Sequence, residues 1–133
     1  YFESARRNIT DDGLFLLDAY GGSDSFLEME EPRDCDGFTY IWDQHFYNPV
    51  NGDVVNHIHF QFPDGTKIKN AFTYEWRLWT LPEIQELLLE AGFSKVHIYW
   101  EGTDEDGEGD GVWSQVTGAD ADEGWVAYLV ATP

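Results

Sequence analysis

Hydrophobic and polar residues alternate along the middle of the chain, from Phe38 to Leu78. A period of two is typical of β-strands with one face against a core and the other in water. Two turn sequences, Asn48–Gly52 and Pro63–Gly65, divide this stretch. The pattern therefore predicts a three-stranded antiparallel meander, and the second turn places Phe60 beside Ile68.

The two faces of this predicted meander differ in chemistry. One is an aromatic face made of Tyr40, Trp42, Phe46, Phe60, Phe72, Tyr74 and Trp76. The other carries Asp43, His45, His57 and His59, and the first turn places Asp43 beside His57. We expect a polar sheet face with Asp43 paired to His57. Contact of these imidazoles with a substrate or with a metal is the alternative, and we assign no metal site.

Other segments have different periods. The apolar run Leu14–Tyr20 predicts a strand that is covered on both faces, as in a parallel sheet. Thr80 begins a predicted helix, because Glu83 stands at capping-box spacing and leucines recur at helical spacing until Gly92. Phe93–Trp100 and Trp125–Ala131 predict two further strands.

The remaining segments lack a clear period. Tyr1–Arg7 is typical of the last turns of a helix, because its arginines suit a helix C-terminus, so we expect the chain to be part of something longer. We predict a loop or short helix at Ser23–Gly37 and an acidic loop at Glu101–Gly124. The alternating glycines Gly107, Gly109 and Gly111 precede no helix and predict no phosphate cradle.

Composition excludes several classes of function. The 133 residues include 26 acidic and 7 basic side chains, a formal net charge of −19. This charge repels phosphate backbones and anionic lipid, so we expect neither nucleic-acid nor membrane partners. A single cysteine, Cys35, forms no internal disulfide, and no apolar run is long enough for a membrane span. We therefore expect a cytoplasmic protein.

Three segments, in this order, resemble a known family: Tyr1–Tyr20, the helix from Trp79 to Phe93, and the two closing strands. The run from Trp79 to Val96 reads W-T-x-x-E-I-x-x-L-L-x-x-A-G-F-x-x-V. It resembles the last helix and sixth strand of class I S-adenosylmethionine-dependent methyltransferases of the small-molecule type. Asn8–Gly13 resembles the turn before that family's fifth strand. The resemblance implies an α/β fold: the C-terminal half of a Rossmann-like sheet, with Trp125–Ala131 as an antiparallel strand between the other two and residues 38–78 as a lid-like insertion.

The resemblance also implies where the cofactor binds. In that family, the residues that hold S-adenosylmethionine belong to the N-terminal half of the domain, which would lie upstream of Tyr1. We therefore expect residues 1–133 to be a single C-terminal portion, inactive by itself, of an enzyme that methylates a small molecule. The bare edge of the strand Leu14–Tyr20 would favour a homodimer.

The candidate site residues follow from the same resemblance, because an insertion at this place often covers the substrate. The predicted substrate-binding residues are Tyr20, Trp42, Tyr74 and Trp76. The candidates for a catalytic base are His45, His57 and Glu75.

Two other interpretations remain open. The carboxylates Asp104, Asp106 and Glu108 have the spacing of a calcium loop, but Gln115 stands where the bidentate glutamate is required. The alternative to a methyltransferase is a cupin-like or hotdog-like antiparallel module that binds a small apolar ligand or a metal.

Overall fold

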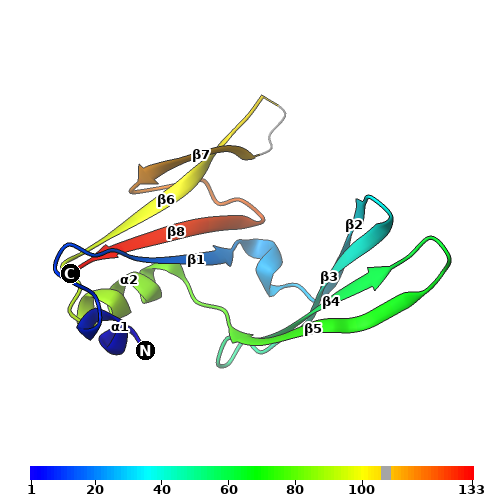
Figure 1. Ribbon diagram of the computed structural model, residues 1–133, viewed down its shortest axis with the longest axis horizontal. Coiled ribbons are helices and arrows are strands. Elements are labelled where there is room, and N and C mark those ends of the chain that lie inside the picture. The colour runs from blue at the N-terminus through cyan, green and yellow to red at the C-terminus, as the bar shows by residue number, and fades with distance from the viewer. Residues whose placement is uncertain (106–108) are drawn as a thin grey trace. The chain divides into compact units, whose positions relative to one another are not determined.

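The computed structural model describes residues 1–105 and 109–133 (Figure 1). The chain divides into two compact units, each built on its own sheet. The first unit, called here the helix-covered unit, comprises residues 1–22 and 79–133, and the second, the meander unit, comprises residues 23–78. The compact meander unit thus begins before Phe38, the predicted start of the insertion.

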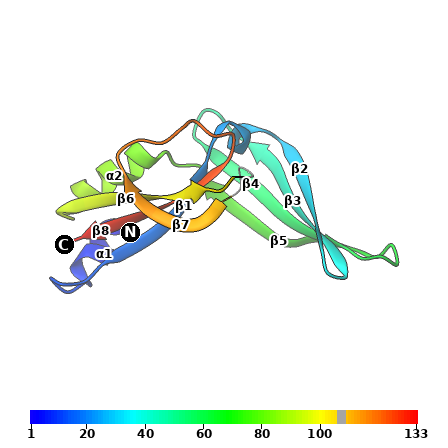
Figure 2. The ribbon, with the colours of Figure 1, turned by 90° about the horizontal axis from the view of Figure 1, so that it is seen from above.

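The helix-covered unit contains a four-stranded sheet in the order β1-β8-β6-β7, which Figure 1 shows and which Figure 2 views from above. Its strands are β1 (Phe15–Gly21), β6 (Lys95–Thr103), β7 (Gly109–Val116) and β8 (Trp125–Thr132). As predicted, β8 lies between β1 and β6 and is antiparallel to both. Strand β1 lies at one edge of the sheet.

Two helices, α1 (Phe2–Arg7) and α2 (Leu81–Glu90), pack on this sheet. Helix α2 begins as its sequence predicts: the Thr80 hydroxyl accepts the Glu83 N–H at 3.4 Å, while the Glu83 carboxylate accepts the Thr80 N–H at 2.9 Å. After its last residue, Gly92 adopts a φ of +96°, a conformation that glycine allows without strain. Within the described residues, neither helix has the length and hydropathy that a bilayer span requires.

The core of this unit is apolar. Its buried members are Ile84, Leu88, Phe93, Leu129 and Ala131. Phe15 and Leu17 pack against them from β1, whereas Leu16 is 61% exposed. The helices therefore cover one face of β1, and the prediction of a strand covered on both faces is wrong.

The meander unit contains a second four-stranded sheet in the order β2-β3-β4-β5. Its strands are β2 (Met29–Cys35), β3 (Phe38–Tyr47), β4 (Asp53–Gln61) and β5 (Lys67–Arg77), preceded by a 3-10 turn at Ser23–Phe26. The predicted meander is confirmed, because Trp42 pairs with Ile58 and Phe60 with Ile68. Gly65 has a φ of +86°, the left-handed conformation that the turn requires.

The predicted fold class is wrong. We expected part of a Rossmann-like α/β sheet with an inserted three-stranded meander, but every strand pairing in the described residues is antiparallel. The parallel strands β1 and β6 do not pair with each other, because β8 separates them. In the described part of the chain, β2 and β5 lie at opposite edges of an open sheet, so the meander does not close into a cupin-like barrel.

Two strands formed where we predicted loops. Strand β2 carries Pro32 and several charges at an exposed sheet edge, where a strand needs little hydrophobic pattern. Strand β7 begins with glycines, and Trp113 packs on Tyr128 with ring centroids 4.3 Å apart. The glycine and calcium-loop candidates Gly107, Asp106 and Glu108 lie outside the described residues.

Candidate functional site

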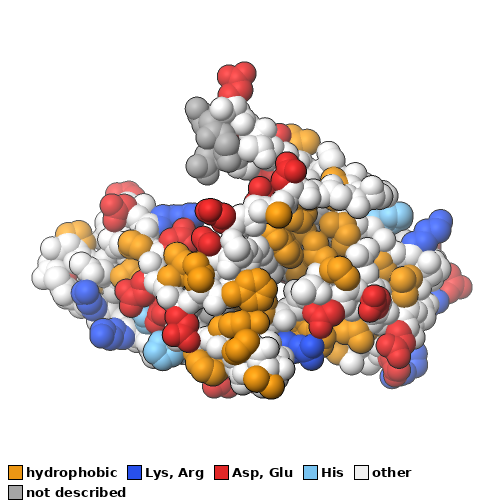
Figure 3. Space-filling view, turned by 180° about the vertical axis from the view of Figure 1, so that it is seen from behind, with side chains coloured by type: hydrophobic (Ala, Val, Ile, Leu, Met, Phe, Trp, Pro, Cys, Tyr) orange, Lys and Arg blue, Asp and Glu red, His pale blue; other side chains and the backbone are white. Residues whose placement is uncertain are grey.

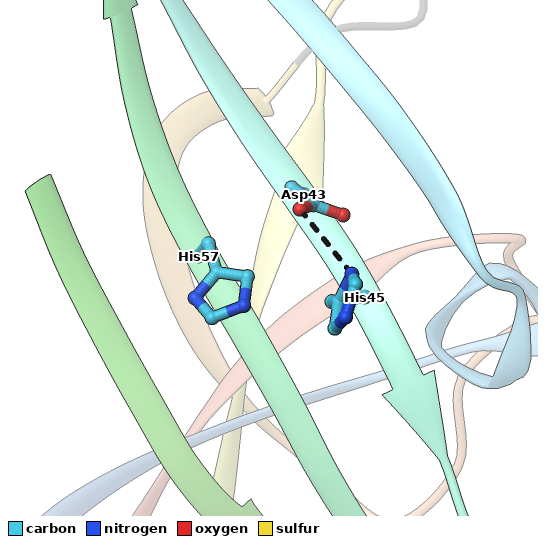
Figure 4. A group of neighbouring side chains, drawn as sticks. All are labelled: Asp43, His45 and His57. Atoms are coloured by element: carbon cyan, nitrogen blue, oxygen red, sulfur yellow. Dashed lines mark ion pairs between the residues drawn. The ribbon is translucent and has the colours of Figure 1, made fainter. Parts of the chain in front are cut away.

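Carboxylate and imidazole side chains gather on one face of the meander sheet, called here the histidine face. Its members are Asp43 and His45 from β3 and His57 and His59 from β4. Figure 4 shows the first three. Asp43 and His57 are buried, at 9% and 8% exposure. Since buried polar groups cost free energy unless they are hydrogen-bonded, the partners of these side chains matter.

Asp43 pairs with His57 across the strands, yet its hydrogen bond is made to His59. The distance from His59 Nε2 to Asp43 Oδ2 is 3.1 Å. The other nitrogen of His59, Nδ1, accepts the backbone N–H of Asn70 at 2.9 Å. Because Nδ1 accepts, the proton of His59 resides on Nε2 and is donated to the carboxylate. The predicted pair of Asp43 with His57 is therefore replaced by Asp43 with His59.

A bulge in β5 brings the Asn70 N–H to His59. The pairs Ile58 with Phe72 and Phe60 with Ile68 leave two extra residues on β5 opposite His59. Within the bulge, Asn70 has a φ of +49°, unusual for a residue other than glycine, and its N–H points at His59 instead of at a strand carbonyl. Bulges often lie next to functional sites, where they redirect one group.

His57 is held by a residue of β5. Its Nδ1 lies 2.9 Å from the Thr73 hydroxyl of β5. Its second ring nitrogen points toward His45, as Figure 4 shows, and the centroids of these two rings are 5.0 Å apart. The side chain of His45 is 63% exposed, and its Nδ1 lies 3.8 Å from Asp43 Oδ2. Buried Asp43 and His57 and exposed His45 thus converge on one point at the surface of the sheet.

A second bulge positions His45. Gln44 pairs with Asn56 and Phe46 with Val55, so His45 is the extra residue of β3. Cross-strand partners share a face, so Phe46 lies with Val55 on the histidine face, and not on the aromatic face as predicted. Tyr47 takes that place and packs on Phe26 with centroids 5.2 Å apart.

The aromatic face lies on the opposite side of the sheet. Tyr74 contacts both of the other predicted residues there, with ring centroids 6.2 Å from Trp42 and 4.4 Å from Trp76. Trp76 is 45% exposed and Phe72 54%. Burial, followed by the nearby Tyr74, raises the pKa of Tyr40 above its ordinary value. The space-filling view in Figure 3 shows patches of hydrophobic side chains on the surface, with carboxylates between them.

The structure therefore divides the predicted site residues into separate groups. His45, His57 and Glu75 share the histidine face, since Glu75 pairs with Val55 and stands two residues from Thr73. Trp42, Tyr74 and Trp76 occupy the aromatic face, and Tyr20 belongs to β1 in the helix-covered unit. One small molecule on the meander sheet cannot contact both faces.

Sequence reasoning missed three residues that shape the histidine face. His59 was placed on the correct face but given no role as the partner of Asp43. Asn70 and Thr73 orient the two β4 histidines. In the predicted register, with Phe60 beside Ile68 and no bulge, His57 would lie opposite Ala71. The bulge at Asn70 brings Thr73 to His57, and such a bulge leaves no signal in a period-two pattern.

Comparisons with known proteins give a likeness among solved structures. No family model matches the sequence, and no curated protein matches it. Among solved structures, the chain is similar to an S-adenosylmethionine-dependent methyltransferase from Clostridium acetobutylicum, with a TM-score of 0.59 and 15% sequence identity. The match covers 99% of this chain and 49% of that one, so this chain spans about half the length of its neighbour. At this identity, the likeness concerns the fold.

Proposed function

We propose that this chain is the C-terminal portion of an S-adenosylmethionine-dependent methyltransferase that acts on a small molecule. The observation that carries the proposal is the structural match over 99% of the chain, which runs through both the helix-covered and the meander units. The sequence resemblance of Trp79–Val96 points independently to the same family. The share of the neighbour that is matched, 49%, leaves about half of such an enzyme to hold the cofactor.

The aromatic face is the proposed acceptor-binding surface. Methyl transfer depends mainly on placing a nucleophile in line with the sulfonium, so binding and orientation supply much of the catalysis. Trp42, Tyr74 and Trp76 form a contiguous set of rings, and each of these residues is at least partly exposed. Such rings bury a small apolar molecule and also attract a cationic sulfonium.

This choice separates acceptor binding from acid–base chemistry on the meander sheet. His45, His57 and Glu75 lie on the opposite face, so they are not assigned as the base for an acceptor held by the tryptophans. Methyl transfer requires no base when the acceptor is already nucleophilic, and the proposal therefore includes none.

Calorimetry with S-adenosylhomocysteine tests the cofactor part of the proposal. The complete natural protein is titrated beside residues 1–133. We expect the complete protein to bind and residues 1–133 alone to show no heat of binding. Absence of binding to the complete protein, or equally tight binding to residues 1–133, would contradict the proposed division of the enzyme.

Isotope transfer tests the acceptor part. The complete protein is incubated with S-adenosylmethionine labelled with ¹³C on its methyl group and with a small-molecule extract, and labelled products are sought by mass spectrometry. We expect a labelled product that the double variant Trp42→Ala/Trp76→Ala forms at least tenfold more slowly, with unchanged affinity for S-adenosylhomocysteine. The matched control is Trp113→Ala in the helix-covered unit. An equal loss in the control would remove the aromatic face from the proposal.

A further inference from the structure

The histidine face carries a set of groups that methyl transfer on the aromatic face does not use. Two sets of three ligand-type side chains meet there with their ligand atoms within 4.8 Å of one another: Asp43 with His45 and His57, and Glu30 with Asp43 and His59. We propose that the first set binds a divalent transition-metal ion. No step of the proposal depends on methyl transfer.

The donor set fits such an ion. Two imidazoles and one carboxylate suit zinc and its first-row neighbours, whereas calcium and magnesium prefer oxygen alone. Bonds of about 2.0–2.2 Å to the metal bring ligand atoms to about 3.0–3.6 Å from one another. The largest adjustment falls to His45, whose side chain is 63% exposed and free to change rotamer. Asp43 and His57 are already fixed by their burial.

The hydrogen bonds behind the ligands are those of a metal site. A metal-binding histidine usually gives its other ring N–H to an acceptor, and a binding carboxylate is usually hydrogen-bonded in turn. His57 has its Nδ1 2.9 Å from the Thr73 hydroxyl, which leaves the nitrogen that faces His45 for the metal. Asp43 receives the Nε2–H of His59, which the Asn70 N–H holds in that tautomer.

The same hydrogen bonds decide between the two sets. Both nitrogens of His59 are already engaged, one with Asp43 and one with Asn70, so His59 would have to break a bond to become a ligand. His57 retains one nitrogen, directed at His45. His59 is therefore a positioning residue, and the metal is held by Asp43, His45 and His57.

Three protein ligands leave coordination positions open. In a tetrahedral site one position remains, and in an octahedral site three remain, for water or for an oxygen or nitrogen atom of a small molecule. Because His45 lies at the exposed side of the cluster, the open positions face away from the sheet. Such a site binds a small molecule through a hydroxyl, carboxylate or similar group.

Titration of the 133-residue chain with Zn²⁺ alone tests the proposal. We expect one ion per chain, and a thermal unfolding midpoint that rises with Zn²⁺ concentration. His45→Ala removes an exposed ligand, so the variant is expected to fold; it should bind at least tenfold more weakly and lose the rise in midpoint. Thr73→Val, which removes the partner of His57, should weaken binding about 10–100-fold.

Three control variants locate the ion. Glu30→Ala tests the competing set, His97→Ala removes the histidine of the helix-covered unit, and Cys35→Ser removes the exposed thiol. Each should bind Zn²⁺ within twofold of the unaltered chain. The proposal is overturned if the unaltered chain does not bind, if folded His45→Ala binds as tightly, or if a control variant loses more affinity than His45→Ala.

Discussion

The two units bury different kinds of side chain. Among the described residues of the helix-covered unit, the buried side chains are apolar and include Ile84, Leu88, Phe93 and Leu129. In the meander unit, the buried set comprises one apolar residue, Val54, and four polar ones, Ser25, Asp43, Asn56 and His57. Both sheets have four strands, so the contrast does not arise from strand number.

This contrast separates stability from chemistry. Apolar burial contributes directly to the free energy of unfolding, whereas a buried carboxylate or imidazole contributes only while its hydrogen bonds are intact. Departures from the best choice for folding are expected at functional sites. On the histidine face of the meander unit, the sequence retains two buried polar groups, Asp43 and His57, in place of apolar side chains.

The largest effect is expected in the core of the helix-covered unit. Leu88→Ala removes a side chain with 0% exposure and leaves a cavity between α2 and the sheet, so the free energy of unfolding should fall by about 2–5 kcal/mol. Leu89→Ala, at a position that is 50% exposed, is the matched control and should cost less than about 1 kcal/mol. Urea unfolding measures both, and equal losses would contradict the location of the core.

A smaller effect is expected on the histidine face. His59→Ala leaves the Asp43 carboxylate and the Asn70 N–H without their partner, and should lower the free energy of unfolding by about 1–3 kcal/mol. His45→Ala, at an exposed position, should change it by less than about 0.5 kcal/mol without metal. Urea unfolding followed by tryptophan fluorescence compares the two. An unchanged stability in His59→Ala would show that this hydrogen-bond network does not support the meander.

The N-terminal cap of α2 should contribute less to the free energy of unfolding. Thr80→Ala removes the hydroxyl that accepts the Glu83 N–H, with an expected cost of about 1 kcal/mol. Thr80→Ser keeps the hydroxyl and should restore most of the loss. Thermal unfolding of the three proteins checks this. If the serine and alanine variants unfolded at the same temperature, the capping box would not stabilise the helix-covered unit.

The smallest expected effect concerns the aromatic face and depends on pH. Burial raises the pKa of Tyr40 in the folded state, so the folded state favours the neutral phenol. The contribution of Tyr40 to stability is therefore fully present below its unfolded-state pKa, and it is lost as the pH rises through its folded-state pKa. Tyr40→Phe should lessen the alkaline loss of stability. Unfolding at neutral and alkaline pH, together with absorbance titration of tyrosine, measures the change. The same alkaline loss in the variant would exclude Tyr40 as its source.

Local features of the fold could be predicted from the sequence where turns and caps fix them. The hairpin at Pro63–Gly65 set the pairing of Phe60 with Ile68, and Thr80 with Glu83 set the start of α2. The fold class was missed because the apolar run at Leu14–Tyr20 was interpreted as buried on both faces, while Leu16 is in fact exposed. Apolar content alone does not distinguish a central strand from an edge strand with one open face.

The candidate site was predictable only in part. Alternation along β3 and β4 placed Asp43, His45, His57 and His59 on one face, and strand pairing then brought them together. The bulges at His45 and Asn70 were not predictable, because an inserted residue changes the register without changing the local pattern. Those bulges decide which imidazole binds Asp43, and so which nitrogens remain for a ligand.

The central claim is that hydrogen bonds fix His59 as the partner of Asp43 and leave His45 and His57 to bind a metal. Long-range ¹H–¹⁵N correlation spectra of the four histidine side chains test it most directly. We expect His59 in the Nε2–H tautomer before and after Zn²⁺ is added, while ring-nitrogen signals of His45 and His57 shift and those of His97 stay in place. A change of the His59 tautomer on Zn²⁺ addition, or shifts that exclude His45 or His57, would contradict it.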